Sequence, residues 1–249
     1  MYDLTKIKND VRKPPRILIH GIEGVGKTSF ACQAPSPIML NLERGIPDRY
    51  IESMPQFQAD TYQDCIDLLG SLYKQEHPYK TLIIDSLDVL EVILTAQAQK
   101  TIGSNELTKN YGAGYAERFK MWSNIILGLN ALNDKGMIIL CIAHSVVTKV
   151  MDPLLPEYDK QTLRLYKTET SRFVDWSDIT GYALIKTYTS NEGKRNLAQT
   201  AGEHVIMTHT NPAYTAKTRY EMPDEIPMEW SALAQYIPAL NSEQNIKEE

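Results

Sequence analysis

Residues 21–28 hold the clearest chemical pattern of the chain. They read GIEGVGKT, which fits the phosphate-loop pattern G-x-x-x-x-G-K-[ST]. Glycines in such a loop let backbone N–H groups converge on phosphate oxygens. We therefore expect Lys27 to reach the β- and γ-phosphates of a nucleoside triphosphate, and the Thr28 hydroxyl to bind Mg²⁺. The expected nucleotide-binding residues are Gly21, Ile22, Glu23, Gly24, Val25, Gly26, Lys27, Thr28 and Ser29.

Three further polar residues each end an apolar run. Asp85 closes TLIID and suits a water-mediated Mg²⁺ contact, although Asp is also a common helix N-cap, a role that we assign to Ser86. Glu43 would orient or deprotonate an attacking water, or would be a surface residue at a strand end. His144 would contact the γ-phosphate and report its loss, or would be a structural histidine.

The segments around these residues predict the elements that position them. Continuously apolar runs at 16–20, 37–43, 80–86 and 136–144 predict buried strands, and helical spacing appears at 63–75, 87–100 and 117–134. This alternation predicts an α/β fold, with a mostly parallel central sheet flanked by helices. Segments 178–190 and 203–210 predict a C-terminal antiparallel hairpin. Residues 101–116, rich in Gly and Asn, are expected to form a flexible loop, and residues 145–171 an irregular segment.

Length and composition fit one large domain. We expect an N-terminal arm at 1–15, an ATPase domain at 16–240 and a disordered tail at 241–249. A net charge of −5 argues against a surface that is cationic throughout, but leaves room for a local basic groove. The sequence shows neither an apolar run of membrane-spanning length nor the core of a signal peptide. With three widely spaced cysteines, this composition predicts a cytoplasmic protein without membrane contact, in the host cytoplasm if phage-encoded.

The order of GIEGVGKT, LNLERG, LIIDSL and IAH resembles the RecA-type core of the P-loop ATPases, over residues 16 to about 220. The resemblance implies ATP and Mg²⁺ as ligands and ATP hydrolysis as the activity. It also implies that Glu43 is the catalytic base, that Asp85 belongs to the second nucleotide motif, and that His144 is a polar sensor.

Two further segments, NYGAGYAERFKMW and AYTAKTRYEMPDEIP, look like parts of short phage ATPases of the Sak group. That group is encoded beside single-strand-annealing genes and is related to the RadA branch. RadA's Lys-Asn-Arg-Phe-Gly motif is similar to KTRYE, where Lys217 and Arg219 match but Thr218 and Glu221 depart from it. The resemblance implies a homo-oligomer, ring or filament, in which these cations reach the neighbour's γ-phosphate. The alternative is a solvated pair on a loop.

RecA-type cores contact single-stranded DNA through loops that correspond here to residues 101–120 and 145–172. Both segments interleave cations with aromatic side chains, as single-strand binding requires. The alternative is a flexible, solvated subunit contact. The candidate residues are Lys109, Tyr111, Tyr115, Arg118, Lys120, Lys149, Tyr158, Lys160, Arg164, Tyr166, Lys167 and Arg172.

The leading hypothesis is an ATPase stimulated by single-stranded DNA, acting in phage recombination or strand annealing, with an annealing or single-strand-binding protein as partner. The alternative is a nucleotide-switched module that recruits replication or recombination proteins. A small-molecule kinase ranks last, because neither an Arg-rich lid nor an acceptor pocket is visible. A GTPase lacks its Asn-Lys-x-Asp motif, and an AAA+-type ring ATPase would need an arginine-bearing helical lid where this chain has a hairpin.

Overall fold

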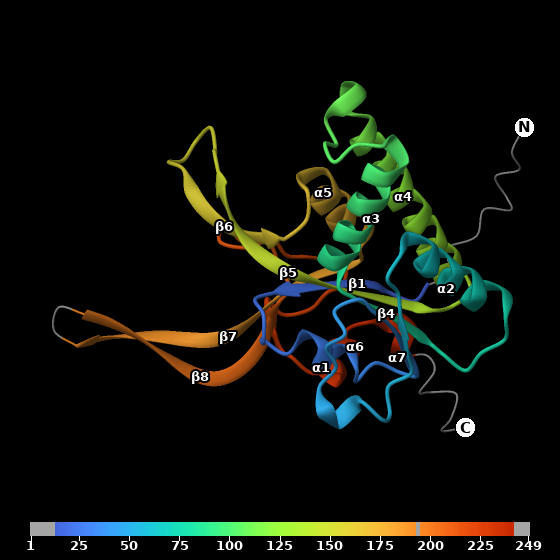
Figure 1. Ribbon diagram of the computed structural model, residues 1–249. Coiled ribbons are helices and arrows are strands. Elements are labelled where there is room, and N and C mark those ends of the chain that lie inside the picture. The colour runs from blue at the N-terminus through green and yellow to red at the C-terminus, as the bar shows by residue number, and fades with distance from the viewer. Residues whose placement is uncertain (1–12, 193–194, 242–249) are drawn as a thin grey trace, which may run out of the picture.

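The structure is a computed structural model that describes residues 13–192 and 195–241 (Figure 1). One sheet runs through this part of the chain. Its strands are β1 (Arg16–Gly21), β2 (Pro37–Asn41), β3 (Gln56–Gln58), β4 (Thr81–Asp85), β5 (Ile138–Val150), β6 (Tyr158–Leu163), β7 (Ile179–Glu192), β8 (Arg195–Met207), β9 (Lys217–Thr218) and β10 (Glu225–Pro227). The helices are α1 (Lys27–Ala31), α2 (Tyr62–Lys74), α3 (Leu87–Ile102), α4 (Lys109–Asp134), α5 (Lys167–Trp176), α6 (Trp230–Ala234) and α7 (Pro238–Asn241).

The strand order is β10–β8–β7–β1–β5–β4–β2–β3, with β6 added to β5 and β9 to β7. The pairings from β3 through to β7 are parallel, whereas β6, β8, β9 and β10 pair antiparallel. In this register Gly21 lies opposite His144, and Asn41 lies opposite Asp85. The last residues of β1, β2 and β4 therefore meet His144 of β5 at one edge of the parallel part of the sheet. The predicted α/β class and the C-terminal antiparallel strands are confirmed.

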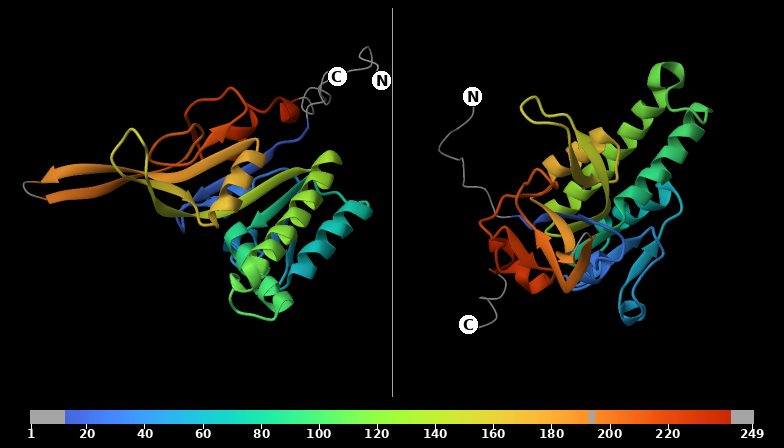
Figure 2. Two further views of the ribbon diagram at one scale, coloured as in Figure 1. Left: turned by 90° about the horizontal axis from the view of Figure 1, so that it is seen from above. Right: turned by 90° about the vertical axis from the view of Figure 1, so that its left-hand side faces the viewer.

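Apolar side chains cover both faces of the sheet because the core strands are apolar at most of their buried positions. Leu18, Leu40 and Ile84 pack with residues of α2, α3, α4 and α5. Ile17 and Met39, which point the other way, pack with residues of α1 and α6. Figure 2 shows these two layers on opposite sides of the strands.

The expectation of a flexible loop at 101–116 is wrong. Helix α3 continues to Ile102, and α4 begins at Lys109, with left-handed backbone at Asn110, Tyr111 and Gly112 before the regular helix. Gly114 is buried, and a Cβ on it would lie 2.7 Å from the Cα of Leu107. This glycine serves close packing, although its residue type suggested a loop.

The expectation of an irregular segment at 145–171 is also wrong. Strand β5 runs on from the core to Val150, turns, and returns as β6, and α5 begins at Lys167. Outside the core this strand pair is exposed on many positions, which removed the apolar signal that marks buried strands.

The strands β7 and β8 form the predicted hairpin, which is longer than expected and projects from the body of the molecule (Figures 1 and 2). Residues 1–12 of the predicted arm and 242–249 of the predicted tail lie outside the described residues. Within the described part, no helix combines the length and apolar character needed to span a bilayer.

Candidate functional site

The phosphate loop connects β1 to α1. Gly24 and Gly26 have φ angles of 73° and 102°, which favour glycine at both positions. The Lys27 ammonium turns back onto this loop and donates to the carbonyls of Gly21 at 3.0 Å and Ile22 at 2.8 Å. Burial lowers the pKa of Lys27, while nearby carboxylates, Asp85 first, oppose the shift. The loop thus holds a buried cation beside its first residues.

Thr28 and Asp85 offer oxygen ligands at the bottom of the loop. The Thr28 hydroxyl donates to Asp85 Oδ2 at 2.6 Å. Burial raises the pKa of Asp85 from 3.8 to about 6, although the bond from Thr28 opposes the shift. Hydroxyl and carboxylate oxygens are the ligands that Mg²⁺ takes in nucleotide sites. The two residues therefore fit the magnesium role predicted for them.

Glu43 lies beside the same site, just after β2. It accepts a hydrogen bond from the hydroxyl of Ser86, and its Oε1 lies 3.3 Å from His144 Nδ1. Ser86 occupies the N-cap position of α3, as expected, but its side chain makes no capping bond. The hydroxyl instead orients Glu43, whose carboxylate keeps about a quarter of its surface exposed.

His144 is buried and held by Asp88. Asp88 Oδ1 accepts from the His144 backbone N–H at 2.9 Å, and Oδ2 lies 3.0 Å from Nδ1. One ligand atom each from Glu43, Asp88 and His144 lie within 4.8 Å of one another, close enough for a metal ion. Because Asp88 already accepts bonds from His144 and Arg164, we assign this cluster to hydrogen bonding.

Asp88, which no sequence pattern indicates, and Arg164, a predicted DNA contact, lie together beside the phosphate loop. Arg164 follows β6 and donates to Asp88 Oδ2 at 2.8 Å and to Glu23 Oε1 at 3.1 Å, so it bridges the phosphate loop and α3. Burial alone would raise the pKa of Asp88, but bonds from His144 and Arg164 outweigh it and hold the pKa well below its usual value. The one available signal was the second Asp in the segment DSLD.

His204 is a second residue that sequence patterns did not indicate. It comes from β8, and its Nδ1 lies 2.7 Å from the carbonyl oxygen of Val25 in the loop. A Cβ on Gly26 would lie 3.7 Å from the same nitrogen. The base of the long hairpin therefore supports the phosphate loop.

These residues surround a cavity of about 290 Å³ at the carboxyl edge of the strands. Its walls bring together the loop, the candidate magnesium ligands, the candidate base and the candidate sensor. The lining residues are Gly24, Gly26, Lys27, Thr28, Ser29, Glu43, Gly45, Pro47, Asp85 and His144.

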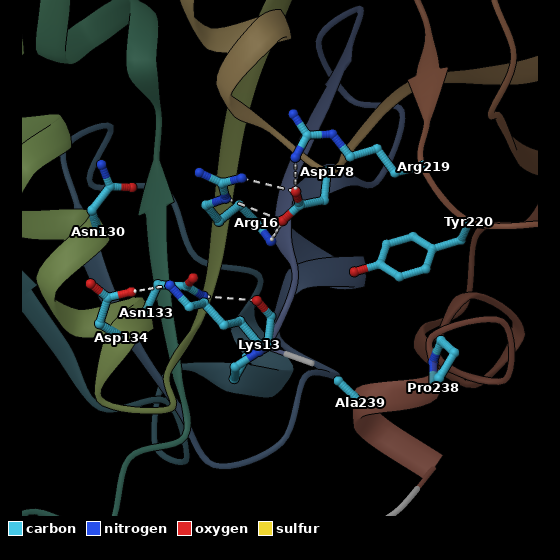
Figure 3. Close-up of a pocket in the computed structure, with 11 residues that line it drawn as sticks. Lys13, Arg16, Asn130, Asn133, Asp134, Asp178, Arg219, Tyr220, Pro238 and Ala239 are labelled. Atoms are coloured by element: carbon cyan, nitrogen blue, oxygen red, sulfur yellow. Dashed lines mark hydrogen bonds and ion pairs between the residues drawn. The ribbon is translucent and has the colours of Figure 1, made fainter. Parts of the chain in front are cut away.

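Lys217 and Arg219 lie at the opposite edge of the sheet, where β1 and β7 begin. The Lys217 ammonium donates to the carbonyls of three residues at the end of α5, Val174, Asp175 and Ser177. Arg219 donates to Asp178 at 2.7 Å and lines a second cavity, of about 660 Å³ (Figure 3). This cavity also contains Lys13, Arg16 and Tyr220. Neither cation can serve the nucleotide site of its own chain.

The candidate DNA contacts divide into two groups. Arg118 is buried against the rings of Tyr115 and Tyr166. Arg172 donates to Ser123 and contacts the ring of Phe119. Both arginines thus have partners within the fold and are not proposed as DNA contacts. Arg164 belongs to the nucleotide site. The candidates left exposed are Lys109, Tyr111, Lys120, Lys149, Tyr166 and Lys167.

Comparisons with known proteins address the family of the chain. No curated protein matches it. Similar solved structures include the flagellar accessory protein FlaH from Methanocaldococcus jannaschii, with 12% identity, a TM-score of 0.38 and coverage of 83% of this chain and 88% of that one. A KaiC-like protein from Pyrococcus horikoshii has 12% identity, a TM-score of 0.43 and coverage of 86% and 85%.

A protein family described as AAA domain matches residues 13–220. The sequence alone speaks against an AAA+-type ring ATPase, and the match corrects that exclusion at the level of the family. Its structural reason still holds in the described residues, where β8 is followed by short strands and short helices in place of a helical lid. The match covers most of the chain and includes the whole phosphate loop, so the protein belongs to the AAA-domain family and is a nucleotide-binding P-loop ATPase.

Proposed function

We propose that the chain hydrolyses ATP with Mg²⁺ as an oligomer, and that single-stranded DNA stimulates the reaction in phage recombination or strand annealing. The proposal of hydrolysis rests on the cavity at the strand ends. This cavity is lined by Lys27, Thr28, Asp85, Glu43 and His144. ATP over other triphosphates, and the recombination pathway, rest on the resemblance to phage RecA-core ATPases.

The residues divide the work as follows. Lys27 and the loop amides would hold the phosphates, and Thr28 and Asp85 would hold Mg²⁺, which would supply charge neutralisation at the phosphates. Glu43 accepts the proton of the attacking water. Ser86 and His144 contact the Glu43 carboxylate and fix its direction. This arrangement leaves Glu43 accessible from the cavity and restrained at one oxygen.

DNA contact is supported by exposed side chains on two separate parts of the molecule. Lys109 and Tyr111 lie at the start of α4, and Tyr111 is fully exposed. Lys149 lies on the extended part of β5, which begins at His144 in the nucleotide site. Cations follow phosphates, and an exposed ring can stack on bases at about 1–3 kcal/mol each.

Oligomer formation is supported by Arg219. Its guanidinium is half-exposed at the edge away from its own nucleotide, so it would act on a neighbour's site. We do not extend this role to Lys217, because a contact with a neighbour would cost it three hydrogen bonds.

The test is the ATPase rate of the purified full chain with and without single-stranded DNA, over a range of salt concentrations. We expect stimulation that weakens as salt rises, because phosphate contacts release counterions. A duplex of the same sequence is the matched control. If single-stranded DNA changes neither the rate nor nucleotide-dependent assembly, the recombination role is wrong.

The alternative, a nucleotide-switched module, is favoured by one observation. The turn between β5 and β6 exposes apolar side chains, with Met151 at 86% and Leu154 at 90% exposure. Surface of this kind suits a protein partner. A hydrolysis rate that ignores DNA, together with an oligomer that forms with ATP and not with ADP, would favour this alternative.

A further inference from the structure

Arg164 contacts the phosphate loop at Glu23. Its Nη1 donates to Glu23, the residue that follows the two loop carbonyls holding Lys27. Lysines of phosphate loops reach the β- and γ-phosphates. Arg164 and Lys27 therefore both contact the first residues of the loop.

The charges around Lys27 call for a second cation. Four carboxylates act on it, those of Asp85, Glu43, Asp88 and Glu23. Among the described residues, Arg164 is the arginine that forms ion pairs with two of these four. A site with this excess of negative charge repels a polyanion unless cations compensate the charge of the carboxylates and the charge of the ligand.

The two ion pairs of Arg164 differ in strength and in exposure. Asp88 is buried and also holds His144, so this pair is anchored in the fold. Glu23 has a side chain that is 73% exposed, where water weakens ion pairs. The arginine can thus exchange Glu23 for a stronger anion and keep Asp88.

We propose that Arg164 acts in cis as a phosphate-contacting arginine. Its guanidinium leaves Glu23 and contacts the terminal phosphate of the nucleotide that is bound to the loop of the same chain. Asp88 holds the guanidinium in place, and Glu23 occupies it when no triphosphate is bound. The inference rests on the proposed ATP site and adds a residue that separates triphosphate from diphosphate. Because Arg164 also donates its backbone N–H to the His144 carbonyl, the contact reaches the root of the β5–β6 hairpin.

The first experiment measures the dissociation constants of a non-hydrolysable ATP analogue and of ADP by calorimetry, with Mg²⁺ and the full chain. We expect Arg164→Ala to weaken the analogue by about 10-fold to 100-fold, the range for a hydrogen bond to a charged group, and to leave ADP binding close to unchanged. Arg172→Ala is the matched control, since it removes a nearby arginine that contacts Ser123. Equal weakening of both nucleotides, or of neither, would overturn the proposal.

Two further variants guard against misfolding and against a merely structural role. Arg164→Lys keeps a cation for Asp88 but loses the two-pronged contact, so its preference for triphosphate should also fall. An unchanged preference in this variant contradicts the proposal if Arg164→Ala does not fold. Glu23→Gln releases Arg164 and should raise the preference for triphosphate over diphosphate. An unchanged or lower preference contradicts the proposal.

The second experiment separates cis from trans action. Arg164→Ala should lower ATP turnover on the order of 10³-fold, the low end for an arginine that stabilises phosphoryl transfer. Mixing it with Lys27→Ala should restore nothing, because no site in the mixture then holds both residues. Recovery of turnover would place Arg164 in a neighbour's site and overturn the cis assignment. If the unchanged protein does not hydrolyse ATP, the proposed function fails, while the binding preference still tests Arg164.

Discussion

Replacing Asp88 by Asn tests whether the carboxylate under the nucleotide site stabilises the fold as the structure implies. Asp88 is buried and accepts bonds from the His144 backbone at 2.9 Å and from Arg164 at 2.8 Å. Removing one member of a buried ion pair costs about 3–5 kcal/mol. Because the Arg164 side chain is 48% exposed, water lowers that cost, and we expect a loss of about 2 kcal/mol in unfolding free energy at pH 7.

The pH dependence gives this prediction its sign. The pKa of Asp88 is lower in the folded protein than its usual value of 3.8. Its stabilisation is therefore fully present above pH 4 and is lost as the pH falls toward the folded pKa. The gap between the original protein and Asp88→Asn should be constant from pH 7 to pH 5 and should narrow below about pH 4.

Urea unfolding of both proteins at several pH values, followed by circular dichroism, measures this gap. Asp134→Asn is a suitable control, because its ion pair with Lys13 lies on the surface, where pairs contribute about 0–1 kcal/mol. A gap that stays the same at pH 3, or that is absent at pH 7, would refute our account of Asp88.

Three other substitutions test the residues proposed to act in hydrolysis. Glu43→Gln should lower hydrolysis by about 10²–10⁴-fold and keep nucleotide affinity, measured by steady-state turnover and calorimetry. Asp85→Asn should abolish Mg²⁺-dependent turnover, yet it should raise the unfolding free energy at pH 8 by about 1–3 kcal/mol. The reason is that the pKa of Asp85 is raised to about 6, so the buried charge destabilises the fold above that pH. A lower unfolding free energy of the variant in urea at pH 8 would contradict this sign. Arg219→Ala should lower turnover on the order of 10³-fold with nucleotide binding kept, and mixing with Lys27→Ala should restore part of it; full turnover in Arg219→Ala alone would show that this arginine does not complete a neighbour's site.

The phosphate loop and the strands around it could be predicted because their signals are local. A buried parallel strand is apolar at each position, and GIEGVGKT contains every residue type that its chemistry needs. The positions of Glu43, Asp85 and His144 followed from the same reasoning, since residues that end parallel strands share one edge. Whether each performs its assigned role stays a prediction.

Other parts of the site depend on contacts between distant segments, which spacing does not reveal. Arg164 meets Asp88 across 76 residues, because β5 turns outside the core and β6 returns beside it. The isolated sequence placed this arginine among exposed cations, where it resembled a DNA contact. His204 reaches Val25 across 179 residues through the β7–β8 hairpin, whose register no local pattern fixes.

Arg164 and Arg219 make different demands on an assembly. Arg164 lies at the edge that holds its own phosphate loop, whereas Arg219 lies at the opposite edge beside Asp178. If both act, each site uses one arginine from its own chain and one from a neighbour. Hydrolysis then requires both the contact of Arg164 with the nucleotide and the assembly of the chains. A cis arginine alone would let a monomer turn over ATP slowly. The dependence of turnover on protein concentration therefore measures how much of the catalysis is shared, since the cis contribution is independent of concentration and the trans contribution is not.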